Sequence, residues 1–399
     1  MTAAETHSTE NRDDGTEGAL YVAFELGWTK WTLAFTTGFG QKARRRTIDA
    51  RDLVTLEAEI EKAQSRFKLP ADARVHSCYE AGRDGFWLDR YLESRGIRNV
   101  VVDSASIEVN RRAKQTKTDR IDVEKLAGML LRYHRGEERV WSVVRPPSVE
   151  DEEARQLHRE MIRMKRERTR HSNRIKGLLA GCGVSVDVDR DLRNTLLDLR
   201  LWDGRLFAEA HSILHGQILR EYERLQLLER QLRALESERS RQIRHGEGRR
   251  IEMVRQLLGL RGVGENSAWL YTMECFSWRQ FRNRRELGSL AGLTPPPYQS
   301  GDSHRDQGMS KAGSRWIRSI AVELAWCWVR FQPDSELSRW YVRRFAEGSK
   351  RVRKIGIVAV ARKLLIKLWQ YVETGEVPKG AVLSDWRGKI NQHTARPAA

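Results

Sequence analysis

The stretch Leu20-Tyr-Val-Ala-Phe-Glu25-Leu-Gly-Trp-Thr-Lys-Trp31-Thr-Leu-Ala-Phe-Thr36 decides how the first part of the chain folds. It contains two runs that are rich in aromatic and β-branched residues, 20–25 and 31–36, and a short segment with Gly27 separates them. Two such runs on either side of a glycine-containing turn predict a β-hairpin. We therefore expect a sheet that begins with an antiparallel pair of strands.

The next elements alternate between strand and helix. In chain order the sequence predicts a polar edge strand, a helix, a strand, a helix and a strand, at residues 42–48, 52–67, 74–80, 85–94 and 98–103. Three meandering strands followed by helix, strand, helix and strand is the element order of the ribonuclease H-like fold. We therefore predict an α/β domain of this class over residues 19–147, preceded by a disordered tail at residues 1–18.

Residues 148–248 are predicted to form a helical coiled-coil linker. Two segments carry apolar residues at alternating spacings of three and four, one around Met161 and the other around Leu225. Narrow apolar stripes of this kind are typical of coiled coils, formed within one chain or with a second protomer. The first segment is also strongly basic and includes Arg166 and Arg170, which form either a solvated surface or a phosphate-binding one. Because nearly all its charges have one sign, we favour phosphate binding.

The charge of the whole chain indicates a polyanionic partner. The 399 residues contain 72 Lys and Arg against 54 Asp and Glu, which gives a net charge of +18. An excess of this size favours nucleic-acid binding, because neutralising phosphates releases counterions. No apolar run approaches the ~20 residues of a membrane-spanning helix, and the four cysteines have no metal-type spacing. We expect a cytoplasmic protein with reduced thiols and no membrane partner.

Four carboxylates in the first region suggest a metal site. Glu25 and Glu80 close the first and fourth predicted strands, which are neighbours in a ribonuclease H-like sheet. Asp119 and Asp122 lie three residues apart on a predicted helix and so share one face. Acids at a helix start also occur simply because they stabilise the helix dipole. Four converging acids in a basic protein favour Mg²⁺, and two such ions can hold the attacking and leaving oxygens of a phosphodiester.

Residues 249–386 are predicted to form a mainly helical domain, followed by a disordered tail at 387–399. Gly262-Val-Gly264 separates two helical patterns and is either a helix-hairpin-helix-like phosphate-binding turn or a tight corner between helices. The stretch 295–313 is so rich in Pro, Gly and Ser that neither helix nor strand is expected there. It contains Ser300, and the basic residues close enough in sequence to hold a phosphate are Lys311, Arg315 and Arg318.

These motifs resemble the DEDD-type transposases of bacterial insertion sequences, the bridge-RNA-guided serine recombinases, over residues 21–330. The family usually has aspartate at the position of Glu25. The motifs that carry the resemblance are Phe24-Glu25-Leu-Gly27, Tyr79-Glu80-Ala-Gly82, Lys117-Thr-Asp119-Arg-Ile-Asp122, Gly262-Val-Gly264, Leu290-Ala-Gly-Leu-Thr-Pro295, Ser300-Gly301, Ser310-Lys-Ala-Gly313 and Arg318.

The resemblance implies a RuvC-like domain of ribonuclease H fold, a coiled-coil linker and a transposase domain with a serine nucleophile. It implies that Ser300 forms a phosphoserine link to DNA while Glu25, Glu80, Asp119 and Asp122 bind Mg²⁺. It also implies a structured noncoding bridge RNA that pairs with donor and target DNA, and a dimer-of-dimers assembly in the bacterial cytoplasm. Two alternatives remain open at this point: a metal-dependent nuclease resembling a Holliday-junction resolvase, in which Ser300 is structural, and a non-catalytic nucleic-acid-binding protein.

Overall fold

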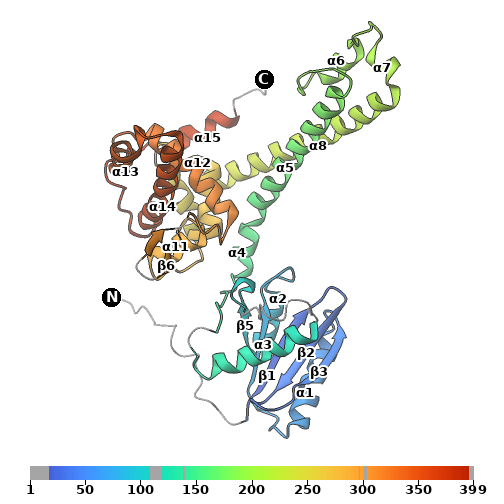
Figure 1. The fold of residues 1–399 in the computed structure, drawn as a ribbon, viewed down its shortest axis with the longest axis vertical. Coiled ribbons are helices and arrows are strands. Elements are labelled where there is room, and N and C mark those ends of the chain that lie inside the picture. Colours follow the sequence, from blue (N-terminus) through green and yellow to red (C-terminus); the bar gives the residue numbers. More distant parts are fainter. Residues whose placement is uncertain are drawn as a thin grey trace. The chain divides into compact units, whose positions relative to one another are not determined.

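A computed structural model describes residues 18–107, 119–137, 140–295, 297–300, 303–306 and 308–394. The chain divides into two compact units, Met1–Pro147 and Ser148–Ala399 (Figure 1). The first unit combines a sheet with helices, and the second is mainly helical. Of the disordered tail predicted at residues 1–18, all but Gly18 lies outside the described residues.

A five-stranded sheet forms the centre of the first unit. Its order is β3-β2-β1-β4-β5, with antiparallel pairing from β1 to β2 and β2 to β3 and parallel pairing from β1 to β4 and β4 to β5. The predicted hairpin and the predicted order of elements are both confirmed. The strands are β1 (Leu20–Leu26), β2 (Lys30–Thr36), β3 (Arg44–Asp49), β4 (Val75–Glu80) and β5 (Arg98–Val102).

The two faces of the sheet are covered by different helices (Figure 1). Successive side chains of a strand point to opposite faces, so Leu20, Val22 and Phe24 pack with α1 (Leu53–Arg66) and α2 (Trp87–Ser94). Tyr21 and Ala23 pack on the other face with α3 (Asp119–His134). A short 3₁₀ helix, η1 (Ser104–Ser106), follows β5. Nearly continuous apolar strands are expected when a sheet is buried on both faces.

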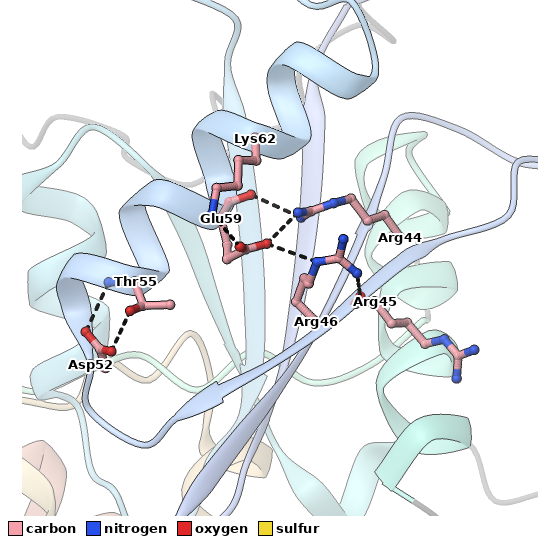
Figure 2. Close-up of polar contacts among 7 residues, drawn as sticks. All are labelled: Arg44, Arg45, Arg46, Asp52, Thr55, Glu59 and Lys62. Atoms are coloured by element: carbon pink, nitrogen blue, oxygen red, sulfur yellow. Dashed lines mark hydrogen bonds and ion pairs between the residues drawn. The ribbon is translucent and has the colours of Figure 1, made fainter.

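Ion pairs to two helices hold the edge strand β3, and Figure 2 shows those to α1. Arg44 Nη2 lies 2.5 Å from Glu59 Oε2 on α1, with both groups buried, and Arg46 Nε lies 3.3 Å from the same oxygen. Arg45 points to the opposite face, where its Nε lies 3.0 Å from Glu124 Oε1 on α3. The polar edge strand that the sequence predicts is therefore present, and its arginines are paired within the unit.

A carboxylate also fixes the start of α1. The Asp52 side chain accepts hydrogen bonds from the Thr55 backbone N–H, at 3.0 Å, and from the Thr55 hydroxyl, at 2.5 Å (Figure 2). Such a cap satisfies a backbone donor that has no partner inside the helix. The helix therefore begins where the sequence predicted it to begin.

Two long helices pair in antiparallel fashion in the second unit (Figure 1). They are α5 (Gln156–Ala180), which follows the short α4 (Val149–Ala154), and α8 (Ser212–His245). Both helices were predicted, and apolar residues including Met161 and Leu225 are buried between them or at their far end. The sequence did not predict α6 (Leu192–Asp198) and α7 (Phe207–Ala210), which contribute Leu192, Leu196 and Phe207 to a small core at that end.

The remainder of the second unit is a helical bundle with one β-hairpin. Its largest core lies around the buried Trp269 and Trp328, with α12 packed against α14. Within the described residues, no helix is long and apolar enough to cross a membrane. The elements are α9 (Arg249–Leu258), α10 (Glu265–Tyr271), the π-helical η2 (Thr272–Phe276), α11 (Arg284–Leu290), β6 (Pro297–Ser300), β7 (Ser303–Asp306), α12 (Arg315–Phe331), α13 (Glu336–Tyr341), the π-helical η3 (Val342–Ala346), α14 (Lys350–Thr374) and α15 (Trp386–Thr394).

Two predictions for this unit are wrong. The segment that contains Ser300 was expected to be neither helix nor strand, but β6 and β7 form a hairpin in which Ser300 pairs with Ser303. Two residues separate these partners, Gly301 and Asp302, and a Gly-Asp pair between strands is a hairpin signal. The tail was expected to be disordered from Arg387, but α15 forms there because the fully buried Ile390 anchors it to the core.

Candidate active site

Glu25 and Glu80 lie next to each other across the sheet. Phe24 pairs with Tyr79 in the parallel register of β1 and β4, so the residue that follows each of them occupies the next position on its strand. Both acids point to the face that α3 covers, because side chains alternate along a strand and Ala23 and Cys78 already lie on that face. The acids are therefore neighbours at the carboxyl ends of two strands.

The helix α3 crosses this face in the direction opposite to β1 and β4. Near its carboxyl end, the His134 ring centroid is 4.1 Å from that of His76, which lies near the start of β4. Two turns earlier in the helix, the Leu126 carbonyl oxygen is 3.8 Å from the Sγ of Cys78, further along the same strand. The amino end of α3 is therefore at the carboxyl ends of the strands.

Asp122 thus reaches the same end of the sheet as the two glutamates. It lies one helical turn before Leu126, and Glu80 lies two residues after Cys78. A helical turn rises ~5.4 Å and two strand residues span ~6.6 Å, so the two acids are at similar levels. Asp122 and Glu25 are half-buried and Glu80 is exposed.

Asp119 is the first residue of α3, and its side chain lies outside the described residues. Among the side chains that the structure describes, no three His, Cys, Asp or Glu groups are arranged to hold a metal ion. The backbone places the start of α3 at the sheet end that carries Glu25 and Glu80, so three of the predicted ligands and the Cα of the fourth share one region.

Ser300 is the last residue of β6, beside the turn of the hairpin. Its side chain lies outside the described residues, whereas the segments at the base of the hairpin are described. Gly292 has φ +62°, and a Cβ added there would lie 2.0 Å from the Ala312 carbonyl oxygen. Gly313 has φ +96°, and its added Cβ would lie 2.4 Å from the Leu290 carbonyl oxygen. The segments entering and leaving the hairpin therefore press against each other, which only glycine allows.

Arg318 joins the same two segments. Its Nη1 donates to the Ala291 carbonyl at 3.2 Å and to the Lys311 carbonyl at 3.0 Å. Arg318 is half-buried, whereas Lys311 and Arg315 are exposed. Arg315 is the first residue of α12, which Ser314 caps through the Ile317 N–H. Of the three cations predicted to bind phosphate, Arg318 thus also holds the base of the hairpin, and the other two face solvent.

The Gly262-Val-Gly264 turn joins α9 to α10, as predicted. Gly262 has φ +88°, and its added Cβ would lie 3.1 Å from the Cβ of Phe331, so the turn needs glycine there. Gly264 is exposed, with open space around an added Cβ. The Nζ of Lys389 donates to three carbonyls of the turn region, those of Leu258, Leu260 and Val263, at 2.5, 2.7 and 3.3 Å. Burial lowers the pKa of Lys389 to about 8.

Arg166 and Arg170 are exposed on α5. Together with Ile162, Lys165 and Thr169 they line a shallow depression on the surface of that helix. Lys165 Nζ also lies 3.0 Å from Glu236 Oε1 on α8. The two arginines thus present positive charge to solvent, and phosphate contact by them remains a prediction.

A buried ionic cluster around Glu274 was not predicted. Its Oε1 lies 2.9 Å from His158 Nε2 and 2.6 Å from Arg159 Nε, and its Oε2 lies 2.9 Å from Arg159 Nη2. Burial alone would raise the pKa of Glu274, but the hydrogen bonds from His158 and Arg159 lower it to about 2. Arg159 belongs to the basic segment of α5, so not every cation there is available to phosphate. No local pattern reveals such a pair, because its members lie far apart in the sequence.

Comparison with known proteins identifies the family. The model of the transposase IS116/IS110/IS902 family matches residues 254–339. The protein y4rJ of Sinorhizobium fredii (strain NBRC 101917 / NGR234), named as a transposase, is 40% identical over 383 residues, which are 92% of this chain and 95% of that protein. The chain belongs to the IS116/IS110/IS902 family of transposases.

Two further relatives are transposases of named insertion sequences. The transposase for insertion sequence element IS1533 of Leptospira borgpetersenii is 26% identical over 277 residues, covering 68% of this chain and 75% of that protein. The transposase for insertion sequence element IS1328 of Yersinia enterocolitica is 24% identical over 234 residues, covering 58% and 66%. This member of the IS116/IS110/IS902 family is therefore an enzyme of DNA transposition. The matched residues 254–339 contain Ser300 and its basic neighbours, whereas the four carboxylates lie before them.

Proposed function

We propose that this transposase cuts and rejoins DNA strands through Ser300, with Mg²⁺ bound by Glu25, Glu80, Asp119 and Asp122. The observation that carries the proposal is the arrangement in the first unit, in which two strand ends and the start of α3 meet at one end of the sheet. The strand order β3-β2-β1-β4-β5 supports a RuvC-like ribonuclease H fold for this unit.

The donor atoms fit Mg²⁺. Carboxylate oxygens are its preferred protein ligands, and the ion keeps other positions for water and phosphate. When bound, Mg²⁺ would polarise the scissile phosphate and stabilise the charge that develops on it. The four side chains provide carboxylate oxygens as ligands in one region, and they repel nucleic acid when no cation is bound.

The hairpin position suits a nucleophile. A serine hydroxyl is weakly nucleophilic at neutral pH and depends on how it is oriented and activated. Ser300 is at the turn end of β6, while Gly292, Gly313 and Arg318 fix the base of the hairpin. The exposed Lys311 and Arg315 would bind the phosphates of the strand under attack. A rigid base with the serine at the tip would let Ser300 reach DNA that other parts of the protein hold.

In the proposed complex a structured bridge RNA pairs with donor and target DNA and so supplies the sequence choice. The protein then binds mostly backbone and shape, which agrees with its net charge of +18. We propose that the division into residues 19–147, 148–248 and 249–386 corresponds to a RuvC-like domain, a coiled-coil linker and a transposase domain. The chain would act as a dimer of dimers, with the serine of one protomer working with the carboxylates of another.

The test of the serine is cleavage by Ser300→Ala, with Ser303→Ala as the matched control, because these residues pair across the hairpin. Ser300→Ala is expected to bind RNA and DNA normally, to cut no DNA and to form no covalent protein–DNA adduct, while Ser303→Ala keeps all three properties. If Ser300→Ala cuts DNA at the parental rate, the enzyme is a nuclease that uses metal and water.

The test of the acids is cleavage by Asp119→Ala and Asp122→Ala with and without Mg²⁺. Both variants should lose cleavage and keep, or slightly strengthen, nucleic-acid binding, because a negative charge is removed. Glu25→Asp should change the rate or the metal preference, since the carboxylate then lies one methylene closer to the backbone. Normal cleavage by both aspartate variants would contradict the proposed metal site.

A further inference from the structure

Trp28 is an exposed tryptophan with two arginines against its ring. It lies in the turn between β1 and β2, three residues after Glu25, and 65% of its surface is accessible. The guanidinium carbons of Arg51 and Arg83 are each 4.9 Å from the indole ring. Cation–π contacts at this distance are attractive. The indole therefore has two guanidinium groups over its ring, and most of the residue's surface is open to solvent.

Hydrogen bonds and ion pairs join Trp28, Arg51 and Arg83, called here the Trp28 group, through Asp84. Arg51 Nη1 donates to the Trp28 carbonyl at 3.3 Å, and Arg51 Nη2 lies 3.0 Å from Asp84 Oδ1. Arg83 Nη2 lies 3.5 Å from the other oxygen of Asp84, whose side chain is only 6% exposed. The turn itself is tight, because a Cβ added at Gly27 would lie 2.4 Å from the Lys30 carbonyl oxygen. The two arginines and the turn that carries Trp28 are thus held together.

The Trp28 group lies at the end of the sheet that carries the candidate metal ligands. Trp28 follows β1, which carries Glu25, and Arg83 follows β4, which ends at Glu80. The contact between Trp28 and Arg83 therefore joins the two loops that leave the acidic end of the sheet. The indole and the acids are thus at the same end of the sheet.

We propose that Trp28 stacks with an unpaired base of the nucleic acid next to the carboxylates, while Arg51 and Arg83 bind its neighbouring phosphates. Every base has a flat face that can stack on an aromatic ring, so such a contact needs an unpaired base but no particular sequence. Flanking positive charge favours a polyanion over an apolar protein surface. The inference rests on the proposed function and adds to it a contact that favours strands opened at the cutting site.

The test uses the full chain and two DNA probes of one sequence, in buffer with Ca²⁺ in place of Mg²⁺, so that a cation neutralises the carboxylates while cleavage is suppressed. One probe is fully paired, and the other carries an unpaired 2-aminopurine, whose fluorescence falls when it stacks. The variants are Trp28→Ala and Trp28→Phe. Trp202→Ala, in the second unit, is the matched control because Trp202 is also exposed, at 93%.

The expected result is selective. Trp28→Ala should weaken binding of the unpaired probe by roughly 5- to 150-fold, the range for one stacked base, and should abolish the quenching. Binding of the paired probe should change less than about twofold, because phosphate contacts remain. Trp28→Phe should keep the quenching and most of the affinity, and Trp202→Ala should match the parent.

Three outcomes would overturn the inference. One is equal weakening of both probes by Trp28→Ala, another is no change with either probe, and the third is a parent protein that does not quench 2-aminopurine. A change in sedimentation mass with unaltered DNA binding would assign the indole to protein contact instead. Failure of the proposed function looks different, because the Ser300→Ala and Asp122→Ala variants would then still cut DNA whatever Trp28→Ala does.

Discussion

Replacing Glu274 with glutamine should destabilise the second unit in a pH-dependent way. The carboxylate is buried against His158 and Arg159, at 2.9 and 2.6 Å. Its pKa falls from 4.5 to about 2, because the hydrogen bonds from these residues outweigh the effect of burial. At about 1.4 kcal/mol for each factor of ten, this difference corresponds to about 3 kcal/mol of folding free energy. Glutamine keeps the shape but not the charge.

The sign of the pH effect follows from the lowered pKa. A carboxylate with a lower pKa in the folded state stabilises the protein fully above its unfolded pKa, near 4.5, and loses this contribution as the pH falls toward 2. The penalty of Glu274→Gln should therefore be about 3 kcal/mol at pH 7 and about half of that at pH 3.

Urea unfolding followed by far-ultraviolet circular dichroism at the two pH values measures this penalty. The matched control is Glu236→Gln, whose carboxylate pairs with Lys165 at 3.0 Å but is 43% exposed. An exposed pair of this kind contributes at most about 1 kcal/mol. A Glu274→Gln penalty no larger than that of the control, or one that is equal at pH 7 and pH 3, would refute the reasoning.

Two further predictions concern binding and the hairpin. Affinity for nucleic acid should fall steeply with salt, because each neutralised phosphate adds ~0.7 to 0.9 to the slope of log affinity against log salt concentration. The double variant Lys311→Ala with Arg315→Ala should have a shallower slope. An unchanged slope would show that these residues do not contact phosphate. Structured RNA should outcompete random duplex DNA at equal salt in the same titration. Gly292→Ala should lower the free energy of unfolding by about 1–3 kcal/mol, because its Cβ would lie 2.0 Å from the Ala312 carbonyl oxygen. The control Gly177→Ala lies on an exposed helix with open space around the added Cβ, and it should raise the free energy of unfolding by about 1 kcal/mol. Equal melting temperatures for the two variants would contradict this.

The sheet could be predicted because its signals are local. The apolar runs of β1 and β2, the turn glycine between them and the helical spacing in α1 together define the order of elements. Glu25 and Glu80 stand at the ends of strands in the sequence itself, and topology makes them neighbours. The direction of α3 across the sheet could not be predicted, because it depends on contacts such as that of Leu126 with Cys78.

The errors have two causes. Either the element is short, or the residues that stabilise it are distant in the sequence. β6 and β7 have four residues each and few apolar side chains, so the Gly-Asp turn is the only local signal that predicts them. α15 is polar, and what orders it is the burial of Ile390 and the bonds from Lys389 to carbonyls near Leu260. Glu274 was missed for the second of these reasons, because its partner His158 lies 116 residues away in the sequence.

The position of β1 has a consequence for how the first unit forms. β1 is central in the sheet, and its antiparallel neighbour β2 follows it directly, so that hairpin can close within microseconds. Its parallel neighbour is β4, so this edge of β1 stays unpaired until Val75, the partner of Leu20, has been synthesised. Until then a newly made chain exposes an apolar, unpaired edge, which is the kind of surface that recruits other chains. Aggregation should therefore increase with the number of unfinished chains present at one time, and weaker expression should favour folded product over aggregate.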